Sequence, residues 1–436
     1  SRGELRRQGA VGAGMSFSVR VLALAQRLRP LLLKVLPHAW LRKAQGAVIA
    51  QAEGGLAARP LLPLDKDAAT DGVNLVGYIR AEMGLGQAVR LCAEALDAAE
   101  VPFTLYDFSP ANAMSYGDST WAERISDTLP YNTNVINLNP PALWQLFSLV
   151  GREMWDKRRT IGVWVWELES IPDEWTKGLA LVDELWAPSE FVCQALRKAT
   201  DKPVYRVPHP AKAEASGAGR EAFGLPADLF LVLAMFDSNS VAGRKNPLGA
   251  IRAFRRAFGE DDGVGIVIKA NYPSAADLQM LRDELVGLPH VFLFVDTMPK
   301  QRVDDLTAVC DVFLSLHRAE GFGLVLAEAM LLGTPCVATN WSGNTDFMTA
   351  DTACLVGYDL VTLREDVGVY PAGARWAEPD IEDAAGWLRR LRSDVEFRDA
   401  IAANAHTYAA ARLAPAAVGV LIRERLGLPR HDEAAG

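Results

Sequence analysis

Short apolar runs alternate with longer amphipathic segments along most of the chain, a pattern typical of parallel strands joined by helices. In the first half, strands are predicted at residues 73–79, 103–108, 134–138, 161–166, 184–187 and 204–207, with a helix at 85–99. In the second half, strands are predicted at residues 230–236, 265–270, 291–295, 311–316, 335–339 and 353–356. Helices are predicted between these strands at residues 247–258, 275–286, 301–308 and 322–332. The pattern therefore predicts an α/β protein with two doubly wound halves.

The ends of the chain differ from this alternating region. Residues 381–426 are Ala-rich and predict helices only, and residues 44–71 are of low complexity. We expect a leader and linker, two Rossmann-like domains and a helical tail that crosses back to the first domain. Their boundaries are predicted at residues 1–70, 71–208, 209–394 and 395–436. Two such domains in tandem would face each other across a cleft, with the carboxyl ends of their strands inward.

Size and composition fit this layout. The chain has 436 residues and 50% apolar composition, enough for two ordinary domains. Five widely spaced cysteines form no Cys-x-x-Cys pair, which predicts reduced thiols in a cytosolic protein. The six histidines show no spacing of four on any predicted helix, so neither a metal site nor a cofactor is expected.

Charge is unevenly distributed along the chain. Residues 1–52 hold nine basic residues and one acidic residue, a net charge of +8 against −9 for the whole chain. Within them, residues 17–36 mix leucines and valines with cations, too short and too charged to span a bilayer, and no signal-peptide cleavage site follows. We expect residues 17–36 to form a basic amphipathic helix and residues 15–52 to bind an anionic membrane surface, on the cytoplasmic face of the plasma membrane. The alternatives are packing on a domain or partner, or a disordered leader.

Residues 1–14 precede the first methionine and are set aside as an expression scar or an upstream extension. No nucleic-acid partner is expected, and the oligomeric state stays open.

Two carboxylates, Glu320 and Glu328, flank a glycine turn between a predicted strand and a predicted helix that is closed by Gly333. Backbone amides at such a turn can bind an anion, which the helix dipole also favours. Carboxylates are natural acceptors for sugar hydroxyls, and both could reach one elongated ligand. This pattern predicts a sugar-nucleotide site; the alternative is an ordinary helix start with acidic residues.

A basic pair, Arg244 and Lys245, occupies the first strand-to-helix turn of the second half. Cations at a helix N-terminus are unfavourable unless an anion is shared there, so we expect them to hold a diphosphate. The alternative is a solvated basic pair. Asn344 and Asp346 follow the carboxyl end of a later strand and are expected to line the same pocket.

The first half offers two further candidates. Gly84 and Gly86 open a helix after a strand, and Asp107 ends the next strand, as in a dinucleotide-binding fold. However, Val89 stands at the third glycine position, so a plain tight turn is the alternative. Glu167 ends another strand near three tryptophans and could orient an acceptor hydroxyl or touch the donor. Ser189 is expected to cap a helix.

Four segments together closely resemble the group 1 (family 4-like) retaining glycosyltransferases of the GT-B fold. They are SLHRAEGFGL at 315–324, AEAM at 327–330, GTP at 333–335 and NWSGNTDFM at 340–348. The resemblance implies that Glu320 contacts the transferred sugar and Glu328 the ribose of the donor. It also places the amides of Gly321, Phe322, Gly323 and Leu324 near the diphosphate or the sugar.

The family often has an arginine five or six residues before its diphosphate lysine. Here Lys245 matches the lysine, whereas the earlier positions are Ser240 and Asn239, so Arg244 is the substitute. The resemblance also implies that the loop of Gly84 and Gly86 approaches donor or acceptor.

The resulting hypothesis is an enzyme that transfers a hexose or deoxyhexose from a nucleotide-diphosphate sugar to a glycan or lipid-linked acceptor. The resemblance favours mannose or rhamnose, retention of anomeric configuration and surface polysaccharide or lipopolysaccharide synthesis. Glu320, Lys245 and Glu167 are its candidate catalytic residues. The alternatives are a sugar-nucleotide epimerase of the same fold, a nicotinamide-dependent oxidoreductase and a non-catalytic protein tethered to the membrane.

Overall fold

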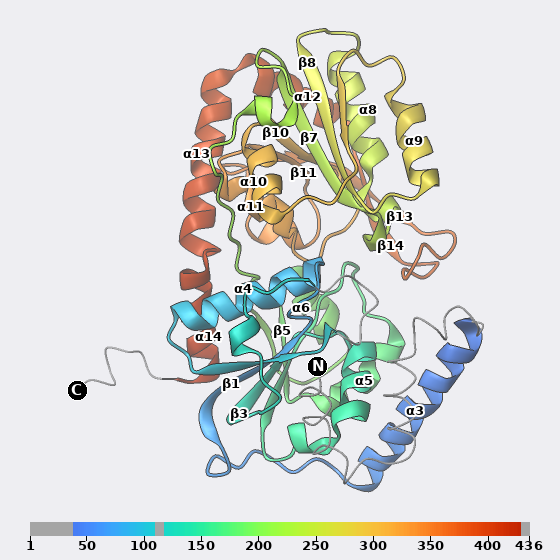
Figure 1. Ribbon diagram of the computed structural model, residues 1–436. Coiled ribbons are helices and arrows are strands. Elements are labelled where there is room, and N and C mark those ends of the chain that lie inside the picture. The colour runs from blue at the N-terminus through green and yellow to red at the C-terminus, as the bar shows by residue number, and fades with distance from the viewer. Residues whose placement is uncertain (1–37, 110–116, 429–436) are drawn as a thin grey trace, which may run out of the picture. The chain divides into compact units, whose positions relative to one another are not determined.

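The computed structural model describes residues 38–109 and 117–428, which form two compact units (Figure 1). Of the described residues, unit 1 contains those up to Ala93 and those within Glu100–Trp164 and Pro172–Trp186. Unit 2 contains Glu94–Ala99, Val165–Ile171 and the described residues from Ala187 onward. The predicted domains are continuous stretches of the chain with boundaries at residues 208 and 394, whereas each observed unit combines several separate stretches.

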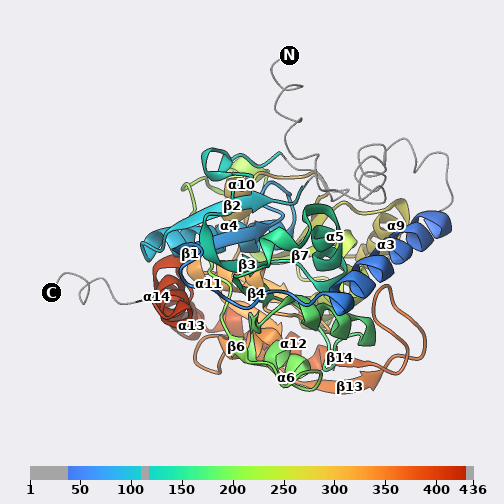
Figure 2. The ribbon, with the colours of Figure 1, turned by 90° about the horizontal axis from the view of Figure 1, so that it is seen from below.

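The first parallel sheet has six strands in the order β2-β1-β3-β4-β5-β6. The strands are β1 (Thr70–Gly77), β2 (Phe103–Asp107), β3 (Tyr131–Ile136), β4 (Arg159–Val163), β5 (Glu184–Ala187) and β6 (Val204–Arg206). The helices of this region are α3 (His38–Ala58), α4 (Gly84–Ala98), α5 (Pro140–Val150) and α6 (Glu190–Arg197). Helix α3 runs alongside α5 in both views (Figure 1, Figure 2).

The second parallel sheet has the order β12-β11-β10-β7-β8-β9. Its strands are β7 (Phe230–Asp237), β8 (Val264–Asn271), β9 (Val291–Phe294), β10 (Val312–Ser315), β11 (Cys336–Thr339) and β12 (Cys354–Val356). The chain builds outward from β7 in one direction with β8 and β9, and in the other with β10 to β12. The strand order therefore reverses between β7 and β10, the point at which open α/β sheets bind ligands beyond the strands' carboxyl ends.

Helices cover both faces of this second sheet. The helices of this half are α7 (Ala242–Lys245), α8 (Pro247–Phe258), α9 (Ala275–Leu285), α10 (Lys300–Ala308), α11 (Leu324–Leu331), α12 (Ile381–Ser393), α13 (Val395–Arg412) and α14 (Pro415–Leu426), and the last of them packs elsewhere, as described below. One core cluster joins the sheet to α8, α9 and α12, and the other joins it to α10, α11 and α13. Burial on both faces explains why these strands appear in the sequence as continuous apolar runs.

The structure confirms the predicted strands and the α/β class, and it adds elements that the sequence analysis missed. Helices α3 and α5 were not predicted. Part of α3 lies in residues 44–71, which were interpreted as low-complexity sequence. A separate antiparallel hairpin of β13 (Tyr358–Thr362) and β14 (Arg375–Pro379) was also missed. The helix predicted from residue 322 begins at Leu324, because Gly323 adopts a left-handed φ of 94° as its N-cap.

The helical tail is confirmed, and its last helix packs on the end of α4. A Cβ atom on Gly419 would lie 2.3 Å from the carbonyl oxygen of Ala95, and Arg423 donates to the carbonyl of Ala99 at 2.7 Å. Among the described helices, none is long and apolar enough to cross a membrane. The predicted leader helix at residues 17–36 lies outside the described residues.

Candidate active site

The turn after β7 is held by its own backbone and by the end of β10. Val241 and Asn246 bracket α7 with positive φ angles of 61° and 53°. The Asn246 side chain accepts a hydrogen bond from the Gly249 amide at 3.1 Å and donates to the Leu316 carbonyl at 2.9 Å. This fixes α7, and with it the basic pair, beside the segment that follows β10.

Glu320, which lies in that segment, forms ion pairs with both cations. Its carboxylate is hydrogen-bonded by Lys245 and lies 3.1 Å from Arg244 Nη1. Arg244 is buried and also donates to the Ala319 carbonyl at 2.6 Å. The Glu320 amide donates to the hydroxyl of Ser342 at 2.8 Å. Both the backbone and the carboxylate of Glu320 are therefore fixed.

The electrostatics of this group keep Glu320 ionised. Burial by itself raises the pKa of Glu320, but Lys245, Arg244 and His317 lower that pKa to about 2. Burial lowers the pKa of Lys245, and the attraction of Glu320 only partly opposes it. Burial also lowers the pKa of Arg244, but the neighbouring carboxylates outweigh it and raise that pKa above its ordinary value. The site thus pairs a fixed carboxylate with cations.

Glycines let three chain segments meet at this point. A Cβ atom on Gly321 would lie 2.7 Å from Val165 Cγ1, and one on Gly343 would lie 2.2 Å from the Gly321 carbonyl oxygen. The ring of Phe322 is buried, with its centroid 4.9 Å from that of Phe347. The turn from Gly321 to Leu324 therefore has a structural requirement for its glycines, whatever its amides bind.

Glu328 lies in α11 and has a separate cationic partner. Its carboxylate is buried and lies 3.3 Å from Nζ of Lys300 in α10, which also pairs with Asp304. Burial raises the pKa of Glu328 to about 7, because Lys300 opposes the effect only in part. The pKa of Glu328 therefore lies well above that of Glu320.

Glu167 belongs to unit 2 and joins the charged group. Its pKa lies above the ordinary value, chiefly because of burial, to which Glu320 adds. Arg244, Lys245 and a hydrogen bond from Tyr370 oppose this rise. The neighbouring tryptophans serve mainly as core: Trp164 and Trp175 are buried against each other in unit 1, with ring centroids 6.1 Å apart. The structure therefore brings Glu167, Arg244, Lys245 and Glu320 together.

Asn344 and Asp346 are occupied by other partners. Asn344 is fully buried; its amide oxygen accepts a hydrogen bond from His317 Nε2 at 3.0 Å, and its amide nitrogen donates to the Thr339 carbonyl at 3.0 Å. Asp346 accepts a hydrogen bond from the Glu190 amide at 2.8 Å and pairs with Arg206 at 3.0 Å. Both side chains hold the surrounding loops and α6 in place, and their lining of a donor pocket stays a prediction.

Two residues that the sequence analysis did not single out lie in this network. His317 is fully buried, and its Nδ1 lies 3.0 Å from the hydroxyl of Ser315. Its position just before the glycine turn was the available signal. Tyr370 lies fifty residues further along the chain, and nothing in its local sequence indicates a contact with Glu167.

The other first-half candidates, Gly84, Gly86 and Asp107, lie in unit 1. A Cβ atom on Gly86 would lie 2.1 Å from the Ala81 carbonyl oxygen, whereas one on Gly84 would meet no atom within 4 Å. Asp107 accepts hydrogen bonds from the hydroxyl and amide of Ser109, at 2.6 and 3.0 Å. These contacts explain Gly86 and Asp107 as parts of tight turns. Ser189 caps α6 as predicted, accepting from the Val192 amide at 3.3 Å.

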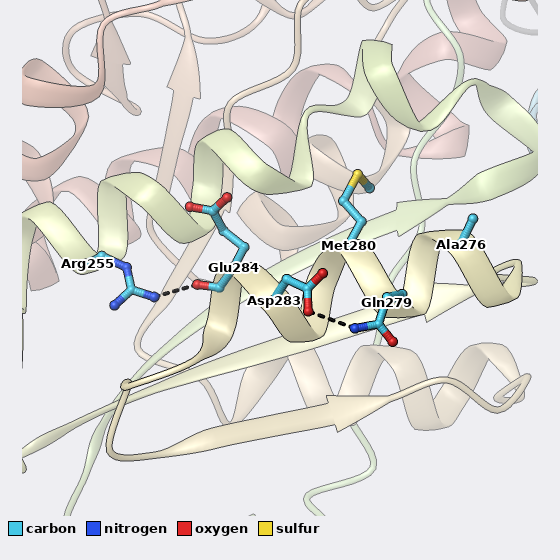
Figure 3. A pocket seen from close by; sticks show the side chains of 6 residues that line it. All are labelled: Arg255, Ala276, Gln279, Met280, Asp283 and Glu284. Atoms are coloured by element: carbon cyan, nitrogen blue, oxygen red, sulfur yellow. Dashed lines mark hydrogen bonds between the residues drawn. The ribbon is translucent and has the colours of Figure 1, made fainter.

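A shallow hollow lies elsewhere on unit 2, between α8 and α9 (Figure 3). Arg255 at its edge donates to the carbonyls of Glu284 and Val286, and Asp283 accepts from Gln279 at 2.7 Å. The polar groups of this hollow are thus already paired. Among residues 38–109 and 117–428, no cluster of His, Cys, Asp or Glu is arranged to hold a metal ion.

Comparison with known proteins bears on the second half in particular. Residues 235–406 match the family model described as "Glycosyl transferases group 1", and this stretch contains Lys245, Glu320 and Glu328. The chain is 32% identical over 132 residues to D-inositol 3-phosphate glycosyltransferase of Mycolicibacterium smegmatis. That alignment covers 29% of this chain and 28% of the relative, so the chain matches less than a third of the relative's length.

Solved structures resemble the whole described fold. Anabaena Alr3699/HepE, solved in complex with UDP and glucose, superposes with a TM-score of 0.63 at 14% identity, over 82% of this chain and 100% of its own. Sucrose-phosphate synthase from Thermosynechococcus elongatus gives a TM-score of 0.60 at 16% identity, over 84% of this chain and 100% of its own. The chain therefore has the GT-B fold, and residues 235–406 of its second half resemble the group 1 glycosyl transferases.

Proposed function

We propose that the protein transfers a hexose or deoxyhexose from a nucleotide-diphosphate sugar to a hydroxyl of a glycan or lipid-linked acceptor. Mannose or rhamnose is the favoured sugar, with retention of anomeric configuration and a role in surface polysaccharide synthesis. The observation that carries the proposal is the charged group of Lys245, Arg244, Glu320 and Glu167 beyond the carboxyl ends of β7 and β10. Three of its four members lie in the matched family domain.

Lys245 is the proposed anchor of the diphosphate. As the bond from the anomeric carbon to the phosphate oxygen breaks, negative charge develops on the diphosphate, and a cation held there stabilises it. A diphosphate at Lys245 competes with the Glu320 carboxylate for the ammonium group. Glu320 is then available to accept hydrogen bonds from hydroxyls of the transferred sugar.

Arg244 takes a different role from the one expected from sequence. It is 4% exposed, and its guanidinium is engaged by Glu320 and the Ala319 carbonyl. We therefore assign it to orienting Glu320, with Lys245 as the diphosphate ligand. Glu328 would accept hydrogen bonds from the ribose hydroxyls. Glu167 would orient the acceptor hydroxyl or the sugar.

The departing phosphate oxygen is the proposed acceptor of the proton from the incoming hydroxyl, which is consistent with retention. No metal and no cofactor enters this scheme, and the nucleotide sugar is a co-substrate. We further propose that the protein is cytoplasmic and binds the inner face of the plasma membrane through residues 15–52, because their charge matches an anionic surface.

A thermal-shift panel with GDP, UDP and dTDP tests the donor site. A ligand at a hundred times its dissociation constant stabilises the folded state by about 2.7 kcal/mol. We expect one nucleotide to raise the melting temperature of the wild type, and the Lys245→Ala variant to lose most of that rise. Glu284→Gln, a surface change on the same unit, is the control and should behave like the wild type.

Turnover distinguishes the remaining alternatives. The Lys245→Ala, Glu320→Ala double variant should release no nucleoside diphosphate from GDP-mannose, UDP-glucose or dTDP-rhamnose when the wild type does. Full activity of that variant would overturn the assignment. Formation of an epimerised sugar nucleotide without acceptor would instead establish the epimerase. Loss of nucleotide binding by the double variant would exclude the non-catalytic protein.

A further inference from the structure

The hairpin of β13 and β14 is an addition to the six-stranded sheet. It lies between β12 and α12 and forms a two-stranded antiparallel sheet of its own, with Leu360 opposite Ala377. Its connecting loop contains a small bridge in which Val367 and Tyr370 exchange two backbone hydrogen bonds, of 2.9 and 3.1 Å. The position of Tyr370 is therefore set by backbone pairing within the hairpin.

The hairpin is attached to the segment that carries Glu320. Arg318 makes two hydrogen bonds to the Glu378 carboxylate, at 2.7 and 2.9 Å, and its guanidinium lies 5.4 Å from the centre of the Trp376 ring. The Ala377 amide donates to the Arg318 carbonyl at 2.9 Å, and the Arg318 amide donates to the Arg244 carbonyl at 2.7 Å. The hairpin and the charged site thus form one connected structure.

The same hairpin also contacts the short segment that carries Glu167. Arg375 makes two hydrogen bonds of 3.0 Å to the carboxylate of Glu169. Tyr370 is 2% exposed, and its ring centroid lies 5.5 Å from that of Trp166 and 6.4 Å from that of Trp376. Its hydroxyl bonds to the Glu167 carboxylate. The hairpin therefore contacts this segment on both sides of Glu167.

We propose that Tyr370 is a positioning residue for sugar transfer: its hydroxyl holds one oxygen of Glu167 so that the other oxygen faces the reacting sugar. This inference rests on the proposed function of Glu167. A carboxylate has lone pairs on both oxygens, so one donor can fix its orientation and leave the second oxygen to accept a substrate hydroxyl. Burial raises the pKa of Tyr370, which keeps the phenol a donor.

The charged groups that face Glu167 set the expected pH behaviour. They are Arg244 and Lys245 from α7, Glu320 from the turn before α11, and Tyr370 from the hairpin. The hydrogen bond from Tyr370 favours the ionised carboxylate. Its removal should therefore raise the pKa of Glu167 and move the acid limb of the kcat/KM profile to higher pH.

The test compares Tyr370→Phe with Tyr358→Phe, the same change at a tyrosine of β13 that is 37% exposed. The assay is nucleoside diphosphate release from the donor that the wild type uses, measured from pH 5 to 9. We expect Tyr370→Phe to lower kcat/KM about 10- to 100-fold, the size expected for a hydrogen bond to a charged group. Tyr358→Phe should leave kcat/KM and the acid limb unchanged.

A double variant distinguishes positioning from a general effect on folding. If Tyr370 acts through Glu167, Tyr370→Phe should have little further effect in a Glu167→Gln background. Fully additive losses, or a Tyr370→Phe variant with the pH profile and activity of Tyr358→Phe, would overturn this inference while leaving the donor site intact. Failure of the proposed function is recognised separately, because the wild type would then neither bind a nucleoside diphosphate nor release one.

Discussion

Replacing Glu328 by Gln should stabilise the protein at alkaline pH while weakening its hold on the nucleotide. Glu328 is buried in α11, and Lys300, its cationic partner at 3.3 Å, is shared with Asp304. A buried carboxylate with incomplete compensation costs stability once it ionises. Gln keeps the shape and removes the charge, so that cost should disappear.

The size of the effect follows from the pKa of Glu328, which burial raises from an ordinary 4.5 to about 7. Between these two values the folded protein holds a proton that the unfolded chain has released, so stability falls as pH rises through this window. At 1.36 kcal/mol per pKa unit, the ionised carboxylate costs about 3 kcal/mol above pH 7 and nothing below pH 4.

Urea unfolding followed by circular dichroism at pH 5 and pH 8 measures this difference. The stability of Glu328→Gln relative to wild type should rise by roughly 2–3 kcal/mol between the two pH values, whereas that of the Glu284→Gln control should not change. The variant should also show a smaller nucleotide-induced thermal shift, because an amide nitrogen cannot accept a ribose hydroxyl. A stability gap that is the same at both pH values would refute the reasoning.

Three further changes test other parts of the chain. Gly86→Ala should cost about 1–3 kcal/mol in urea unfolding because of its close contact, whereas Gly84→Ala should be neutral or slightly stabilising; equal losses would contradict the turn interpretation. Asp346→Ala should lose about 1 kcal/mol by freeing the Glu190 amide, with the nucleotide-induced thermal shift unchanged. Removing residues 15–37, which contain four basic residues, should abolish sedimentation with phosphatidylglycerol vesicles; retained binding would refute the membrane proposal.

The fold could be predicted where burial gave strands a local signature. The runs at β7 and β8 are apolar on both faces, and α8 was predicted with its observed bounds because Pro247 and Gly259 mark its two ends. The hairpin of β13 and β14 could not be predicted in the same way. Its residues 358–362 are mostly exposed and polar, so hydrophobic periodicity gave no signal.

The site could be predicted in part because the carboxyl ends of neighbouring parallel strands meet at one edge. That rule places Lys245, which follows β7, and Glu320, which follows β10, at the same edge of the sheet. The structure shows the two side chains in direct contact, which was not predicted. The place of Glu167 in the sequence assigned it to the first half, but in the structure it belongs to unit 2. Tyr370 was missed because its contact joins positions about 200 residues apart, and no local pattern encodes such a contact.

The cost of burying these charges favours a functional explanation over a structural one. The pKa values of Glu328 and Glu167 are raised by burial and that of Lys245 is lowered by burial, so the site stabilises each of these three ions less well than water does. Apolar residues of similar volume often stabilise such positions as well as, or better than, a buried ion pair. A chain that retains several poorly compensated charges near one glycine turn gains little stability from them, which supports the proposal that they recognise a charged, hydroxyl-rich ligand.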